Sequence, residues 1–180
     1  AAVLAEYFKA KSVPCSVVGA PKTIDGDLKN QYVEASFGFD TASKTFSELV
    51  GNIERDANSA KKYWHFIKLM GRSASHIGLE VALQTQPNIC LISEEIEEKG
   101  LTLADVVKMM ADVVDKRAQM GKNFGVALIP EGLIEFMPDI KKLIAALNDI
   151  VAHHGDELNA ISDFSKKVEK VSTLLSADLA

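Results

Sequence analysis

Short apolar runs alternate with helix-like segments along most of this chain, and this alternation limits the folds that it can adopt. Four runs are rich in β-branched or aromatic residues and are closely followed by Gly, Pro or Glu, which is typical of buried strands. They cover Val13–Val18, Tyr63–Leu69, Asn88–Ile92 and Phe124–Ile129. Strands that are separated by helices pair in parallel through right-handed crossovers. The sequence therefore predicts an α/β fold with a Rossmann-like parallel sheet flanked by helices.

Helical periodicity marks the segments between these strands. Apolar residues recur at helical spacing, or cap and stop residues bound the segment, in residues 2–11, 41–60, 75–84 and 103–120. Thr102 is the expected N-cap of the last of these helices, and Gly121 is its expected stop. No strand is predicted after Ile129, where two helices over residues 140–154 and 157–180 form a helical extension or insertion.

Composition excludes several classes of function. The chain has 180 residues, 47% hydrophobic and 25% charged, which is enough for one domain with a real core. Its formal net charge of -5 argues against nucleic acid or an acidic membrane surface as the main partner. Cys15 and Cys90 both lie in apolar runs without metal-binding spacing, which predicts reduced core thiols and a cytoplasmic protein. No run of about 18 apolar residues is present.

The start of the sequence is unusual for a complete protein. Residue 1 is not methionine, and it falls inside a helix-like segment without a capping residue in front of it. We therefore expect this chain to be a fragment of a longer protein.

The stretch Pro21–Asp27, which we call the acidic loop, carries the densest group of chemically useful side chains. Within seven residues it holds Lys22, Thr23, Asp25 and Asp27, directly after the first predicted strand. Ligands of open α/β sheets bind at the carboxyl ends of the strands. The alternative is a polar turn in which the two carboxylates satisfy local backbone donors.

Other polar residues follow the remaining predicted strands. They are Met70–Arg72, Glu94–Glu95 and Glu131. If the strands are parallel, these loops and the acidic loop meet at one edge and combine a lysine, an arginine and several carboxylates. Phosphoryl transfer needs cations for phosphate oxygens, carboxylates for a divalent ion and a carboxylate base. Neither GxxxxGK[ST] nor GxGxxG is present, so either the donor phosphate is held outside this sequence or the fold is not kinase-like.

Several motifs in order resemble the diphosphate-dependent phosphofructokinases. The segment GAPKTIDGDLKN contains the acidic loop, and FGFDT, the stretch from Tyr63 to His76 that ends in MGRSASH, and LIPEGLIE follow it. The resemblance is nearly continuous to about residue 150, and the tail after His154 loosely matches the helical insertion of long family members. It divides the chain into residues 1–40, the end of a donor-binding domain with the catalytic loop; residues 41–139, the sugar-phosphate-binding domain; and residues 140–180, the helical insertion.

The resemblance implies a reaction and a role for each residue. Phosphate would pass reversibly from diphosphate to the 1-hydroxyl of fructose 6-phosphate, with Mg²⁺ as cofactor and a homo- or hetero-oligomer as the assembly. Asp25 would be the base, Lys22 would compensate the charge of diphosphate, and Arg72 would stabilise the transferring group. The other implied roles are substrate contacts for Thr23, Met70, Gly71 and Glu131 and placement of magnesium for Asp27.

Departures from the family pattern leave two alternatives open. The glycine-rich diphosphate loop and a later substrate-binding segment are absent from these residues, so the 180-residue piece alone is expected to be inactive. An ATP-dependent enzyme is disfavoured by Lys22, where such relatives usually have a small residue. A non-catalytic regulatory subunit is disfavoured because Lys22 and Asp25 are both intact.

Three further polar groups admit simpler interpretations, and a fourth is a weaker functional candidate. His76 is expected to pack or cap near a helix start, Glu94–Glu95 to belong to a solvated charge run, and His153–His154 to form a solvated helix end. Lys61–Lys62 could reach a substrate phosphate across a subunit contact, as basic residues do nearby in relatives.

Overall fold

The structure is built on a parallel sheet of three strands. A computed structural model describes residues 1–178. Within them the strand order is β1-β3-β2, and both pairings are parallel. The strands are β1 (Trp64–Leu69), β2 (Ile89–Cys90) and β3 (Gly125–Pro130). The predicted α/β fold and these three strands are confirmed, although β2 is shorter than Asn88–Ile92.

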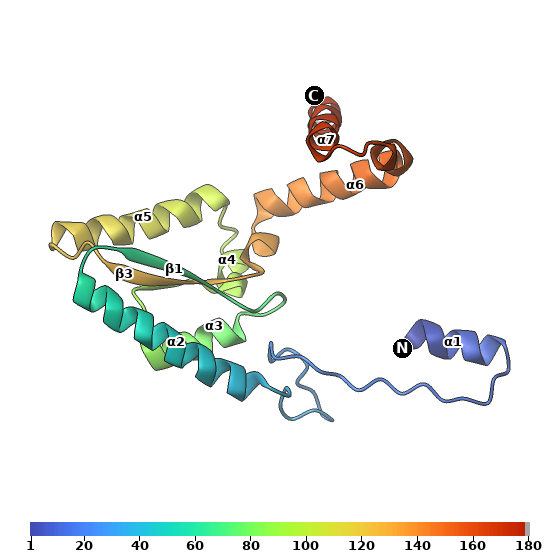
Figure 1. The fold of residues 1–180 in the computed structure, drawn as a ribbon, viewed down its shortest axis with the longest axis horizontal. Coiled ribbons are helices and arrows are strands. Elements are labelled where there is room, and N and C mark those ends of the chain that lie inside the picture. Colours follow the sequence, from blue (N-terminus) through green and yellow to red (C-terminus); the bar gives the residue numbers. More distant parts are fainter. Residues whose placement is uncertain (179–180) are drawn as a thin grey trace.

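Helices cover both faces of this sheet (Figure 1). On one face, helices α2 (Phe39–Ala60) and α3 (His76–Thr85) bury a core that contains Val50, Ile77 and Leu128. On the other face, helices α4 (Ser93–Glu98) and α5 (Leu103–Gln119) pack around Ala127. The central strand β3 supplies Leu128 to one core and Ala127 to the other because successive side chains point to opposite faces.

Local capping explains the boundaries of α5. The Asp105 N–H donates to Thr102 Oγ1, and the Thr102 N–H donates to Asp105 Oδ2 over 3.0 Å. This reciprocal capping box satisfies two backbone donors at the start of the helix. Gly121 follows the helix at φ +72°, a conformation that suits glycine. The predicted N-cap and stop are both confirmed.

The chain continues beyond β3 as helices only, within residues 131–178. These are the 3₁₀ turn η1 (Leu133–Phe136), α6 (Pro138–Ala160) and α7 (Phe164–Asp178), of which α6 and α7 project away from the sheet (Figure 1). The joint predicted near residues 155–156 corresponds to a bend at His154, where two helical segments meet. The second break, between the end of α6 at Ala160 and the start of α7 at Phe164, was not predicted. None of the helices in the described part of the chain has both the length and the apolar character to cross a membrane.

The N-terminal arm, residues 1–22, contains the predicted helix but lacks the predicted strand. Helix α1 (Ala2–Ala10) is present, but the strand predicted at Val13–Val18 is not. Val18 is 88% exposed, and the Cys15 N–H bonds locally to the carbonyl of Val13. A strand needs a neighbour for its backbone groups, and no strand among residues 1–178 lies beside this one.

The two cysteines differ as a result. Cys15 is exposed, so its prediction as a core thiol is wrong. Cys90 is half-buried, and burial raises the pKa of its thiol.

Candidate active site

The carboxyl ends of the strands bring two predicted site segments together. Beyond the β1–β3 pairing, the Glu131 N–H donates to the Leu69 carbonyl over 2.8 Å. The Gly132 N–H then donates to the Gly71 carbonyl over 3.0 Å. These bonds place Met70, Gly71 and Arg72 directly beside Glu131. The predicted convergence of these two loops is therefore present in the structure.

The acidic loop reaches the same edge through the first residue of α3. His76 Nδ1 lies 3.2 Å from the carbonyl oxygen of Gly26. Gly26 has φ +79°, and a Cβ there would lie 3.1 Å from both His76 Nδ1 and the Phe39 ring. Ile24 and Phe39 pack against the core beneath the loop. Glycine thus lets the chain turn in the narrow space between His76 and Phe39.

Thr23, and not the carboxylates, makes the local turn inside the loop. The Asp25 N–H donates to Thr23 Oγ1 over 3.2 Å. Among the hydrogen bonds and ion pairs of residues 1–178, none involves the carboxylate of Asp25 or Asp27. The alternative of a polar turn held by these two carboxylates is therefore wrong. Both side chains remain available to a ligand.

The side chains of Lys22, Arg72 and Glu131 are also free of ion-pair partners within residues 1–178. All three residues are exposed. Arg72 and Glu131 share the sheet edge, whereas Lys22 lies at the exposed end of the N-terminal arm and is not brought against them by a hydrogen bond. Met70, the residue that follows β1, is 48% exposed.

A second network at this edge was missed at the sequence level. The Ser75 N–H donates to Glu94 Oε1 over 2.9 Å, and the Ser93 N–H donates to Ser75 Oγ over 2.9 Å. Burial alone would raise the pKa of the Glu94 carboxyl, but hydrogen bonds from Ser75 and from its own backbone, with the nearby His76, hold that pKa below its usual value. Glu94 therefore joins the starts of α3 and α4.

Glu94 is exposed, as the prediction of a solvated run at Glu94–Glu95 requires, but its bond from Ser75 was not predicted. Glu95 fits the prediction, because it pairs with Lys99 at the surface. Glu94 and Ser75 are 19 residues apart, so no local pattern could have connected them.

The donor set of the acidic loop suits magnesium. Within residues 1–178, no three His, Cys, Asp or Glu side chains gather into a metal cluster. Mg²⁺ does not need one, because it is usually held by one or two carboxylates together with water and substrate phosphates. Asp27 offers an exposed, unpaired carboxylate of this kind.

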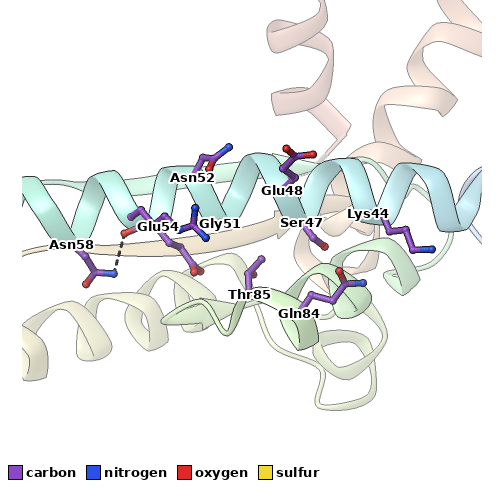
Figure 2. A pocket seen from close by; sticks show the side chains of 10 residues that line it. Lys44, Ser47, Glu48, Gly51, Asn52, Glu54, Asn58, Gln84 and Thr85 are labelled. Carbon is purple, nitrogen blue, oxygen red and sulfur yellow. Dashed lines mark hydrogen bonds between the residues drawn. The ribbon is translucent and has the colours of Figure 1, made fainter.

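Two hollows border α2 and α3. One, of about 680 Å³, runs between the two helices, where Thr85 points toward α2 while Glu48 and Asn52 point away from α3 (Figure 2). Ser47, Asn58 and Thr85 on its walls bond to carbonyls of their own helices. The other, of about 470 Å³, touches Gly26 and His76. The second hollow is the better candidate for a substrate site, because it borders the acidic loop.

Comparison with known proteins agrees with this geometry. The sequence model of the family described as phosphofructokinase matches residues 1–171. The chain belongs to the phosphofructokinase family. Its parallel sheet flanked by helices is consistent with the fold of that family.

Three relatives show how similar the chain is to individual phosphofructokinases. A protein of Entamoeba histolytica named pyrophosphate–fructose 6-phosphate 1-phosphotransferase is 58% identical over all 180 residues, which cover 33% of its length. A Treponema pallidum protein of the same name is 61% identical over 89% of the chain and 28% of its own length. The beta subunit from Solanum tuberosum is 58% identical over 85% of the chain and 27% of its own length. The chain thus spans between about a quarter and a third of the length of these relatives.

Proposed function

We propose that the protein carrying this chain transfers phosphate from diphosphate to the 1-hydroxyl of fructose 6-phosphate, giving fructose 1,6-bisphosphate and orthophosphate. One observation carries the proposal. The acidic loop, with its two unpaired carboxylates, is anchored at His76, at the sheet edge where Arg72 lies beside Glu131. The names of the three relatives, at 58–61% identity, support the same reaction.

Asp25 is the base in this reaction. Its carboxylate takes the proton of the 1-hydroxyl as that oxygen attacks one phosphorus of diphosphate. The new P–O bond forms while the bond from that phosphorus to the bridging oxygen breaks, and orthophosphate leaves. A placed general base contributes about 10²–10⁴-fold to such a step.

The cations act on charge and position. Arg72 binds the oxygens of the transferring phosphoryl group, for which its planar guanidinium is well suited. Lys22 compensates the charge of diphosphate as a point charge. Thr23, Met70, Gly71 and Glu131 hold the sugar phosphate, with Glu131 accepting hydrogen bonds from sugar hydroxyls. Positioning supplies much of the remaining acceleration.

Magnesium is the implied cofactor, and Asp27 is the residue proposed to hold it. Bound there, the ion would neutralise charge on the phosphate oxygens. The Asp27 side chain is exposed, and its carboxylate makes no hydrogen bond or ion pair within residues 1–178.

Replacement of Asp25 in the full-length protein tests this proposal. Asp25→Ser should lower diphosphate-dependent kcat by about 10²–10⁴-fold while leaving the thermal unfolding midpoint unchanged. Asp112→Ser, an exposed position on α5, serves as the matched control and should keep full activity. Retained activity in Asp25→Ser would remove Asp25 from the role of base.

The donor is tested separately. Wild-type turnover should be faster with diphosphate than with ATP, and Lys22→Gly should reduce the diphosphate rate more than the ATP rate. Equal or better use of ATP by the wild type would contradict the role proposed for Lys22. The 180-residue chain alone should show no turnover with either donor.

Assembly and location complete the proposal. We expect a homo- or hetero-oligomer in the cytoplasm. The Solanum tuberosum relative is itself named as a beta subunit, which supports an assembly of more than one chain.

A further inference from the structure

We infer that His76 is a positioning residue that holds the acidic loop in its working conformation through the carbonyl of Gly26. The inference rests on the proposed function for its catalytic consequence. Its structural part, the hydrogen bond between the ring and the loop, can be tested without turnover.

The hydrogen bond from His76 is made to the residue between the two carboxylates of the acidic loop. Gly26 lies between Asp25 and Asp27, and its carbonyl oxygen is 3.2 Å from His76 Nδ1. A carbonyl oxygen only accepts, so Nδ1 carries the hydrogen. The bond therefore sets the orientation of the peptide group that joins Gly26 to Asp27. A change in that peptide would turn the carboxylates on either side of it.

No other hydrogen bond within residues 1–178 holds the acidic loop against the rest of the chain. Ile24 and Phe39 add apolar packing beside the bond from His76. Packing of that kind limits where the loop lies, but it is non-directional and does not fix how a peptide group is turned.

The ring is anchored from two helices. His76 is the first residue of α3, and the residue before it, Ser75, donates to Glu94 Oε1 and accepts at Oγ from the Ser93 N–H. Glu94 and Ser93 belong to the first turn of α4. The loop is thus tied through His76 to a junction between α3 and α4. His76 itself is exposed, so its removal leaves no core cavity.

Side-chain geometry provides a sharp set of variants for the full-length protein. His76→Asn places an amide N–H near the position of Nδ1, whereas His76→Gln places it near Nε2, and His76→Leu has no donor. His153→Leu is the matched control, because the His153 Nδ1 also lies against a backbone carbonyl, that of Asp149 at 2.7 Å, but on the distant helix α6.

Two readouts separate the inference from the proposed function. The first is steady-state kinetics with diphosphate and fructose 6-phosphate. The second is hydrogen–deuterium exchange of a peptide that covers residues 22–36, which needs no activity. His76→Leu should lower kcat by about 10-fold or more, with KM changed by less than about 2-fold, because a small displacement of the base affects mainly the chemical step. It should also speed exchange in the loop peptide.

The pattern of rescue decides the outcome. Asn should restore both readouts, Gln should restore neither, and His153→Leu should match the wild type. Wild-type exchange in His76→Leu would overturn the inference, as would equal losses in the Asn and Leu variants, or a loss expressed in KM alone. If the wild type shows no diphosphate-dependent turnover, the proposed function fails, and the exchange pattern alone decides the role of His76.

Discussion

Two short apolar runs in this chain have similar composition and different structures. The run at residues 13–18 is extended and open to solvent, with Val18 88% exposed. The run at Gly125–Pro130 is the central strand β3, in which Val126 is 1% exposed. β3 lies between two parallel strands, and helices cover both faces of its sheet (Figure 1). The first run has no strand beside it among residues 1–178.

The difference shows that an apolar, β-branched run is not sufficient for a buried strand. Backbone donors and acceptors must be paired by a neighbour before apolar burial can stabilise the strand. The stabilisation is therefore a property of the assembled sheet. It should be large for side chains of the sheet and close to zero for side chains of the N-terminal arm.

The largest effect should come from truncation of the central strand. Leu128→Ala removes a fully buried side chain and should lower the free energy of unfolding by about 2–5 kcal/mol. Val18→Ala in the arm should change it by less than about 0.5 kcal/mol. Urea unfolding of the chain can be followed through Trp64, its one tryptophan. A cost above about 1 kcal/mol for Val18→Ala would mean that the arm packs against a partner.

The next effect should come from glycines. A Cβ at Gly132 would overlap the backbone carbonyl oxygen of Arg72, whereas one at Gly19 would meet only the Ala1 Cβ at 3.6 Å. Gly132→Ala should therefore cost about 1–3 kcal/mol and displace the Arg72 loop. Gly19→Ala should be close to neutral. Equal unfolding midpoints in the two variants would show that the loop after β1 can move freely.

Three of the four strands could be predicted from the sequence because their patterns report local propensity and both faces of the sheet are covered. The fourth could not, since whether residues 13–18 pair depends on backbone that lies elsewhere. The boundaries of α5 were predictable because Thr102, Asp105 and Gly121 form local caps. The end of α6 was not, because Gly155 and Asp156 continue the helix beyond the bend at His154.

The candidate site was predictable in its residue types and in its edge of the sheet. Parallel strands place their carboxyl ends together, so Arg72 and Glu131 could be assigned to one edge. The supports of the site could not be predicted. The bonds from His76 to Gly26 and from Ser75 to Glu94 span 50 and 19 residues, and a sequence pattern carries no signal at such separations.

A smaller effect on stability should come from the helix cap of α5, which the arm helix α1 lacks. Thr102→Ala removes the cap of α5 and should cost about 1 kcal/mol. Amides of the first turn of α5 should then exchange faster, as expected for α1, which has no side-chain cap and buries no residue. Thr45→Ala, exposed in the interior of α2, is the control and should cost less than about 0.5 kcal/mol. An equal loss of unfolding free energy in both variants would show that the Thr102 cap does not stabilise α5.

The smallest effect should be a difference between Glu54 and Glu94 in how their contributions to stability depend on pH. Burial raises the pKa of Glu54 above its ordinary value of 4.5, and its Oε1 is buried without a hydrogen-bond partner within residues 1–178. The stability linked to Glu54 is therefore present below about pH 4.5 and is lost as the pH rises through the folded-state pKa. Glu54→Gln should be more stable than the wild type at pH 7, with the gain vanishing on acidification.

Glu94 should behave in the opposite way. Burial opposes its ionisation, but hydrogen bonds from Ser75 outweigh that burial, so the folded-state pKa lies below 4.5. Its stabilisation is present above about pH 4.5 and is lost as the pH falls through the folded-state pKa. Glu94→Gln should be less stable at pH 7, and the loss should shrink in acid. Unfolding midpoints of both variants from pH 3 to pH 8 would measure the two signs. A shift of the same sign in both would mean that burial, and not the bond from Ser75, governs the junction that holds His76.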